Sequence, residues 1–145
     1  MAVSQIKITS HPTAGGIPNL ETGAQPGVLT KEDVWILREL VKRVADIAQH
    51  PGQEEKRKEW YRHNELGKGK PMLLVFPEDA WFEILPTESL QIKDVYWKQW
   101  EWYLKHLVYR YDKLKDDFVT EAELRVPMVF HDSGWGMEPV YKRTE

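Results

Sequence analysis

The sequence predicts an α/β fold in which N-terminal helices precede one strand–helix–strand unit. Two short apolar runs, Met72–Phe76 and Leu124–Phe130, are strand-like, and a long helical pattern lies between them. Parallel strands need such a crossover, usually a helix, so we expect both strands to run in the same direction. The charged and aromatic loops that follow them would then emerge on one face, where α/β folds place their binding residues. Two strands do not complete a sheet, so the unit is expected to belong to a larger one.

Composition limits the classes of function that fit this chain. Its 145 residues fit one domain, since domains usually hold roughly 100–200 residues. The net charge of −3, from 20 basic and 23 acidic residues, gives no long-range attraction for nucleic acid. No apolar run approaches the ~20 residues of a membrane span, and no secretory pattern opens the chain. The sequence contains no cysteine, which excludes thiolate nucleophiles and cysteine-ligated zinc and fits a cytoplasmic protein.

Residues 1–28 are predicted to form a flexible N-terminal arm, and residues 29–145 a single helical and α/β segment. The arm carries few large apolar side chains, and glycine and proline interrupt it repeatedly. The alternative is an arm that becomes ordered by wrapping around a partner.

Two helices are predicted to follow the arm. Thr30 is a good N-cap, and Asp33, three residues later, makes a weaker version of the capping box. Apolar residues then recur at spacings of three and four as far as Ala48. His50 precedes a proline that stops the helix, and we interpret it as a cation in the last turn. A second helix is predicted over about 53–66, with a thin apolar face and many paired charges.

A third helix is predicted over about 94–114, and its apolar side chains cover more than one face. Such a helix is buried on several sides or docks on another surface. One helical turn is expected before it, at 79–85. Of the two strands, 72–76 is uniformly apolar and suits a strand covered on both faces. The other alternates over 122–130, and Pro127 favours an edge position there.

Several separated patterns resemble one protein family. They are Leu29-Thr30 with its helix, Trp60–Asn64, Lys70–Trp81, Trp100-Glu101-Trp102 with Tyr109-Arg110, Asp116-Asp117, and Val126-Pro127 through His131-Asp132-Ser133-Gly134-Trp135-Gly136. Together, over about residues 28–138, they resemble the N-terminal part of uroporphyrinogen-decarboxylase-like proteins of the corrinoid methyltransferase type.

This resemblance implies a (β/α)8 barrel, of which the chain would hold the N-terminal helices and the first strand–helix–strand unit. It implies methyl transfer from a methylated substrate to a cobalamin-bearing partner, often with a zinc ion. The zinc ligands and most of the barrel would lie downstream of residue 145, so the chain is expected to be a truncated segment that is inactive alone. The arginine-rich signature of true uroporphyrinogen decarboxylases is not recognisable, so porphyrin decarboxylation is not implied.

Six residues in the loops after the two strands are the candidates for substrate binding. Neighbouring carboxylates can serve as acid or base, and a histidine beside an acid can exchange protons or bind a metal. In an intact relative these side chains would border the substrate cavity: Glu78, Trp81, Glu83, His131, Asp132 and Trp135. The structural alternatives are solvated carboxylates beside a helix cap at Asp79, and a tight turn anchored by one tryptophan ring. No metal site is predicted within the chain, because zinc needs three or four protein ligands in a recognisable pattern.

A second hypothesis is a non-enzymatic interaction module. The aromatic helix over 96–114 and the unpaired strand edges would dock onto another chain or onto a second copy of this one. The expected partners are therefore the remainder of the barrel or a second chain, with a corrinoid protein in the intact family. Neither nucleic acid nor a membrane is expected to be a partner.

Overall fold

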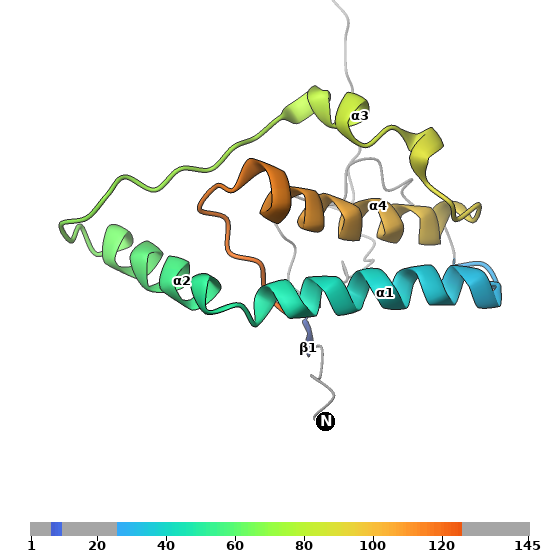
Figure 1. The fold of residues 1–145 in the computed structure, drawn as a ribbon, viewed down its shortest axis with the longest axis horizontal. Coiled ribbons are helices and arrows are strands. Elements are labelled where there is room, and N and C mark those ends of the chain that lie inside the picture. The colour runs from blue at the N-terminus through green and yellow to red at the C-terminus, as the bar shows by residue number, and fades with distance from the viewer. Residues whose placement is uncertain (1–6, 10–25, 126–145) are drawn as a thin grey trace, which may run out of the picture.

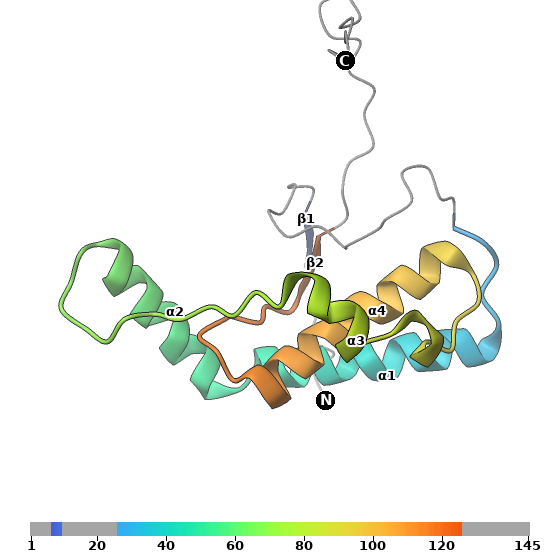
Figure 2. The same cartoon turned by 90° about the horizontal axis from the view of Figure 1, so that it is seen from above.

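Helices dominate the residues that this computed structural model describes, which are 7–9 and 26–125. The elements in chain order are β1 (Lys7–Thr9), α1 (Lys31–Ala48), α2 (Pro51–Asn64), the 3-10 turn η1 (Glu78–Ala80), α3 (Trp81–Ile84), the 3-10 turn η2 (Thr87–Ser89), α4 (Val95–Tyr109), the π-helical turn η3 (Arg110–Leu114) and β2 (Glu123–Arg125). Helices α1 and α4 lie side by side, and α2 continues outward from the end of α1 (Figures 1 and 2).

The predicted strand–helix–strand unit of a (β/α)8 barrel is wrong. Met72–Phe76 forms no strand within the described residues and runs as an extended segment between α2 and η1 (Figure 1). Within the described part of the second run, β2 is a strand, and it pairs in parallel with β1, with Lys7 opposite Glu123. The rest of that run, 126–130, lies outside the described residues. The described chain is thus mostly helical, with one pair of three-residue strands.

The reason for this difference is the hydrogen-bond partner that the first run finds. The N–H groups of Leu73 and Val75 donate to the carboxylates of Asp117 and Asp116, at 2.9 and 3.0 Å. These side chains, together with the Asp117 N–H that bonds the Leu73 carbonyl, therefore occupy the positions where a neighbouring strand would otherwise pair. A short apolar run indicates extended backbone, but it does not indicate what that backbone pairs with.

The predicted start of the first helix is confirmed. The Asp33 N–H donates to Thr30 Oγ1 (3.1 Å), and the Thr30 N–H donates to the Asp33 carboxylate (2.9 Å), so the capping box is complete. The hydrogen bond from the Thr30 hydroxyl to that carboxylate lowers the pKa of Asp33. His50 differs from the prediction, because its Nδ1 accepts a hydrogen bond from the Gly52 N–H (3.1 Å). It caps the start of α2 and is not a last-turn cation of α1.

The hydrophobic core lies between α1 and α4, and the predicted third helix is confirmed. Asp94 caps α4 by accepting a hydrogen bond from the Trp97 N–H (3.1 Å). Val44 of α1 packs with Leu104 and Leu107 of α4, and all three are buried. Around them lie partly buried side chains from both helices and from the later segment: Leu37, Leu40, Val41, Tyr103, Val108, Phe118 and Leu124. The apolar spacing of both helices thus predicts their shared interface.

One carboxylate on α4 is fully buried, and the sequence pattern gives no sign of it. Glu101 accepts hydrogen bonds from the N–H groups of Gln91 and Ile92 and pairs with Lys105 Nζ at 2.6 Å. Lys105 also donates to the Ser89 carbonyl (3.2 Å). Because a buried charge needs such partners, Glu101 fixes the loop before α4 onto the helix that follows it.

The end of α4 turns the chain back on itself. The last residues form the π-helical turn η3, and Lys115 then adopts a left-handed conformation with φ of 53°. An exposed ion pair, Arg43 with Asp112 at 2.9 Å, ties this turn to α1. The reversal returns Asp116 to Arg110, six residues earlier, and directs the following segment past α2.

Candidate functional site

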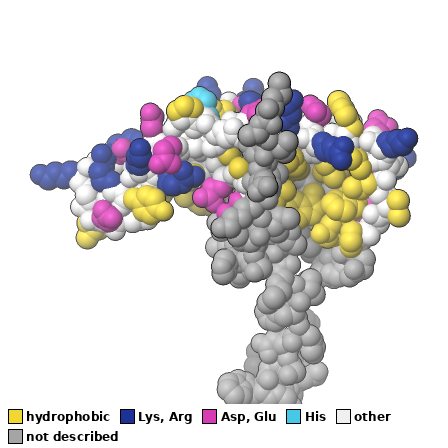
Figure 3. Space-filling model, turned by 90° about the horizontal axis from the view of Figure 1, so that it is seen from below, with side chains coloured by type: hydrophobic (Ala, Val, Ile, Leu, Met, Phe, Trp, Pro, Cys, Tyr) yellow, Lys and Arg dark blue, Asp and Glu magenta, His cyan; other side chains and the backbone are white. Residues whose placement is uncertain are grey.

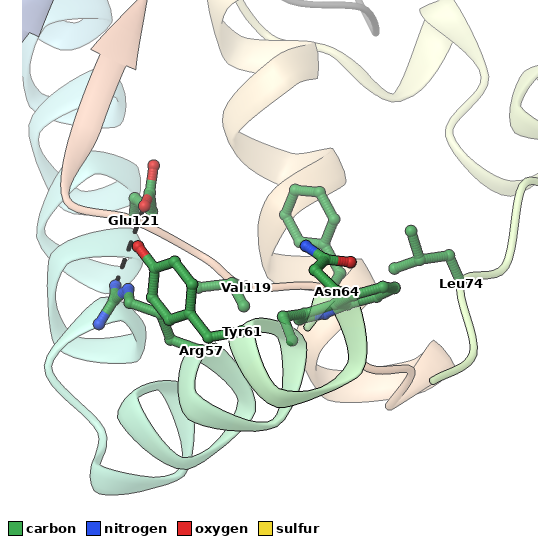
Figure 4. A pocket seen from close by; sticks show the side chains of 8 residues that line it. Arg57, Tyr61, Asn64, Leu74, Val119 and Glu121 are labelled. Carbon is green, nitrogen blue, oxygen red and sulfur yellow. Dashed lines mark ion pairs between the residues drawn. The ribbon is translucent and has the colours of Figure 1, made fainter. Parts of the chain in front are cut away.

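An open groove of about 310 Å³ lies between α2 and the segment that follows η3. Its lining is largely apolar, with one ion pair at 3.9 Å between Arg57 and Glu121. Figure 4 shows this pair at one end of the groove and Leu74 at the other. The lining residues are Arg57, Trp60, Tyr61, Asn64, Leu74, Phe118, Val119 and Glu121.

Segment 116–120 forms the far wall of the groove, opposite α2. Three side chains of α2 hold this wall in place through hydrogen bonds to its backbone. Trp60 Nε1 donates to the Asp117 carbonyl (2.7 Å), and Lys56 Nζ donates to the Asp116 carbonyl (2.7 Å). The buried amide oxygen of Gln53 accepts from the Thr120 N–H (2.9 Å). Segment 116–120 has no regular structure of its own, so these bonds determine its course and therefore the shape of the groove.

The two aspartates at the start of that wall also hold the extended segment. Asp117 accepts from the Leu73 N–H (2.9 Å) and from Lys70 Nζ (2.6 Å), and its own N–H donates to the Leu73 carbonyl (2.9 Å). Asp116 accepts from the Val75 N–H (3.0 Å). We call the set Lys56, Trp60, Lys70, Arg110, Asp116 and Asp117 the clasp, because it joins four separate parts of the chain.

A buried ion pair lies at the centre of the clasp. Arg110 bonds Asp116, and their side chains are only 5% and 3% exposed. The guanidinium of Arg110 also lies over two aromatic rings, 4.4 Å from the centroid of Phe118 and 5.6 Å from that of Phe76. Such a pair is costly to desolvate, and removing one partner leaves the other charge buried without a counter-charge. The clasp therefore depends on both residues together.

The electrostatics of the clasp favour ionised carboxylates. The hydrogen bond from Lys70, and next the one from the Leu73 N–H, lower the pKa of Asp117. A carboxylate that is kept ionised in this way holds the extended segment at every pH above its unfolded pKa of about 4. The contribution is lost only as the pH falls through the still lower pKa of the folded chain.

Large apolar side chains are exposed on α2 and on the chain that follows it. Tyr61, Leu73 and Phe76 are 63%, 64% and 69% exposed, and Leu66 is 94% exposed. A second exposed group includes Trp35, at 63%, on α1. In Figure 3 hydrophobic side chains gather over the half where α1 begins, and at the α2 end a few of them lie among Lys, Arg, Asp and Glu side chains. Contiguous exposed apolar surface marks interaction sites more often than isolated residues do.

Three of the predicted site residues lie together but do not share a cavity. Glu78 and Glu83 are exposed on η1 and α3, whereas Trp81 is buried. The Trp81 ring packs edge-on against Trp102 and His106 of α4, with centroids 6.0 and 4.4 Å away. The structure thus separates the tryptophan, which faces α4, from the two solvated carboxylates.

The ring of His106 lies inside this aromatic cluster. It stacks on Trp102, with centroids 5.3 Å apart and an interplanar angle of 7°. Its Nδ1 is buried and has no hydrogen-bond partner among the described residues. Burial, and next the charge of Arg110, lower the pKa of His106 to about 4. A neutral ring at this place supports packing rather than proton transfer near neutral pH.

The remaining site predictions, His131, Asp132 and Trp135, lie outside the described residues. Over residues 7–9 and 26–125, no three histidine, aspartate or glutamate side chains gather as a metal ion would need. In the same ranges no helix is both long and apolar enough to cross a membrane.

The clasp is the feature that reasoning from the sequence missed. Asp116-Asp117, Trp60 and Lys70 all fall in the patterns quoted for the family resemblance, yet no role could be assigned to them. The available signal was two adjacent acids directly after a long helix, which by itself indicates no more than a solvated turn. Their importance comes from partners 41 to 60 residues away in sequence.

Comparison of the chain with protein-family models, with curated proteins and with solved structures found no match. The groove, the clasp and the exposed apolar side chains are therefore the basis for any functional conclusion.

Proposed function

We propose that this chain is a non-enzymatic interaction module that binds another polypeptide, in the first instance a second copy of itself. The binding surface consists of the groove and the extended segment 71–77. We call the two together the docking face. The observation that carries this proposal is an apolar groove edged by the exposed Tyr61, next to a segment on which Leu73 and Phe76 are also exposed. Its lining offers shape and apolar surface rather than a set of reacting groups.

The docking face is held in place before a partner arrives. The clasp fixes its extended segment through Leu73 and Val75 and fixes its far wall through Trp60 and Lys56. A surface that is already ordered loses little conformational entropy on binding, and this favours affinity. The exposed side chains of Leu73 and Phe76 therefore represent apolar area that a partner can cover at low cost.

The aromatic helix is a weaker candidate for the docking element than the sequence suggested. Trp100, Leu104 and Leu107 of α4 are buried within the chain itself. The apolar surface that is left for a partner comes instead from α2 and from the segment after it.

The first test is self-association measured by sedimentation velocity from about 5 to 500 μM. We expect concentration-dependent dimers for the native chain. Leu73→Lys should weaken association at least about tenfold, because it removes apolar burial and introduces a charge, and tenfold corresponds to about 1.4 kcal/mol. The side chain of Leu73 is exposed, so the variant should still fold.

The matched control is Trp35→Lys, which alters an equally exposed apolar side chain on α1. It should leave the association constant unchanged. Association that is lost with Trp35→Lys but kept with Leu73→Lys would assign the interface to α1 and overturn the proposal. So would a native chain that stays monomeric over the whole range.

A second candidate function follows from the resemblance to corrinoid methyltransferases. We propose that the chain supplies folded structure, not chemistry, to a methyl-transfer protein. In its support, several segments quoted for the resemblance contribute to the clasp: those containing Trp60, Lys70, Arg110 and Asp116-Asp117. With cobalamin, zinc and methylated donors added, we expect no methyl transfer by the chain alone. Measured turnover by these 145 residues would contradict both proposals.

A further inference from the structure

The backbone of the docking face is bonded along one edge and open along the other. Leu73 and Val75 direct their N–H groups to the clasp aspartates. In extended backbone, successive residues present their N–H and C=O groups to opposite sides. The backbone N–H and C=O groups of Met72, Leu74 and Phe76 therefore point away from the clasp aspartates, and among the described residues no hydrogen bond engages them. An open edge of this kind is a template for an added strand.

We propose that this open edge pairs with the same edge of a second copy, in an antiparallel arrangement centred on Leu74. This deepens the proposed function, on which it rests, by naming the partner and the mode of docking. Leu74 then lies opposite Leu74 of the second copy, and Met72 lies opposite Phe76. A two-fold axis through the Leu74 pair makes the interface self-complementary, as closed dimers require.

The positions of the prolines agree with this register. Pro71 is an even number of residues before Leu73 and Val75, so its missing N–H group falls on the clasp side of the segment, and Pro77 lies past the extended part, at the start of η1. Proline therefore removes none of the N–H donors that the backbone hydrogen bonds between the two copies need. Proline is tolerated in strands only where its absent N–H is not needed for pairing.

Charge decides between the two possible strand directions and favours a second copy as the partner. Lys68 precedes the segment and Glu78 and Asp79 follow it, whereas the ammonium group of Lys70 is already paired with Asp117 of its own chain. The lysine end of one copy lies beside the acidic end of the other when the strands are antiparallel, and the two-fold axis repeats this match. A parallel pair would instead place like charges together at both ends, which is unfavourable.

The side chains of Leu73 and Val75 also match in this register. Leu73 of one copy falls opposite Val75 of the other, at a position without direct hydrogen bonds, where side chains approach most closely. The Leu73 side chain, 64% exposed in the single chain, would then be covered by aliphatic neighbours.

Cysteine cross-linking tests the register directly, because the chain has no native cysteine. In the proposed dimer, Leu74→Cys places two Cα atoms about 5.5 Å apart, within the roughly 4.4–6.8 Å that a disulfide allows. Leu73→Cys places like residues on a diagonal of roughly 7–8 Å. With oxidised glutathione as the oxidant, Leu74→Cys should form covalent dimers at least about tenfold faster than Leu73→Cys.

A mixture of two variants gives an independent check of the same register. Leu73→Cys mixed with Val75→Cys should form the mixed dimer faster than either forms its own. Circular dichroism and sedimentation of the reduced variants establish that each folds and associates. Association without Leu74 cross-linking, or equal rates at 73 and 74, overturns the strand pairing while leaving the docking face in place. If Leu74→Cys stays monomeric while the native chain associates, the mixture of Leu73→Cys with Val75→Cys still tests the register.

Discussion

Replacing Asp116 with alanine is expected to lower the free energy of unfolding by about 3–5 kcal/mol, the range for breaking a buried ion pair. The variant leaves the guanidinium of Arg110, 5% exposed, without its counter-charge. It also removes the acceptor for the Val75 N–H and for the Phe118 N–H. Since a domain of this size is usually stable by only 5–15 kcal/mol, the loss should be large in a urea titration followed by tryptophan fluorescence.

Two further variants show whether the loss of stability in Asp116→Ala comes from leaving Arg110 buried without a counter-charge. Asp112→Ala breaks the exposed Arg43–Asp112 pair, whose side chains are 48% and 38% exposed, and should cost no more than about 1 kcal/mol. The double variant Arg110→Met with Asp116→Leu removes both buried charges and should be more stable than Asp116→Ala. If Asp116→Ala cost as little as Asp112→Ala, the clasp would not hold the fold together.

Lowering the pH from 6.5 to 4 is expected to destabilise the fold by about 3 kcal/mol through His106 alone. Burial lowers the pKa of His106 to about 4 in the folded chain, whereas the unfolded value is about 6.5. Between these values the unfolded chain binds a proton that the folded chain does not, so stability falls as the pH falls. Each unit between the two pKa values corresponds to about 1.4 kcal/mol.

The charged groups near His106 act in opposite directions: Arg110 lowers its pKa further, and Asp116 raises it. His106→Phe keeps an aromatic ring between Trp81 and Trp102 and removes the titration. Urea titrations at half-unit pH steps should show a slope in the native chain from pH 6.5 to 4 that this variant lacks. The loss of the Asp117 contribution occurs below about pH 4, outside this window. An unchanged slope in His106→Phe would contradict the assignment.

The helices could be predicted from the sequence because their signals are local. Thr30 and Asp33 sit within one turn of each other and complete the capping box, and Asp94 caps α4 at the predicted place. The apolar spacing along α1 and α4 gives the faces that meet in the core. His50 was misassigned because a residue between two helices can cap either one, and only the orientation of its ring decides.

The candidate site could not be predicted because most of its contacts join residues that are far apart in the sequence. Met72–Phe76 has the composition of a buried strand, but its neighbours are the carboxylates of Asp116 and Asp117, more than 40 residues later. The burial of Glu101 follows from a loop that folds over it, which helical periodicity does not reveal. Trp81 was assigned to a cavity wall from its place after the apolar run, whereas its ring packs on α4.

Hydrogen exchange at single amides, followed by NMR at low and high protein concentration, is the most direct test of the strand pairing proposed for the docking face. The clasp should protect the amides of Leu73 and Val75 at every concentration, because the aspartates bind them within one chain. The amides of Leu74 and Phe76 should become protected only at concentrations where sedimentation shows dimers. Rapid exchange at Leu74 and Phe76 in a fully associated sample would contradict the account.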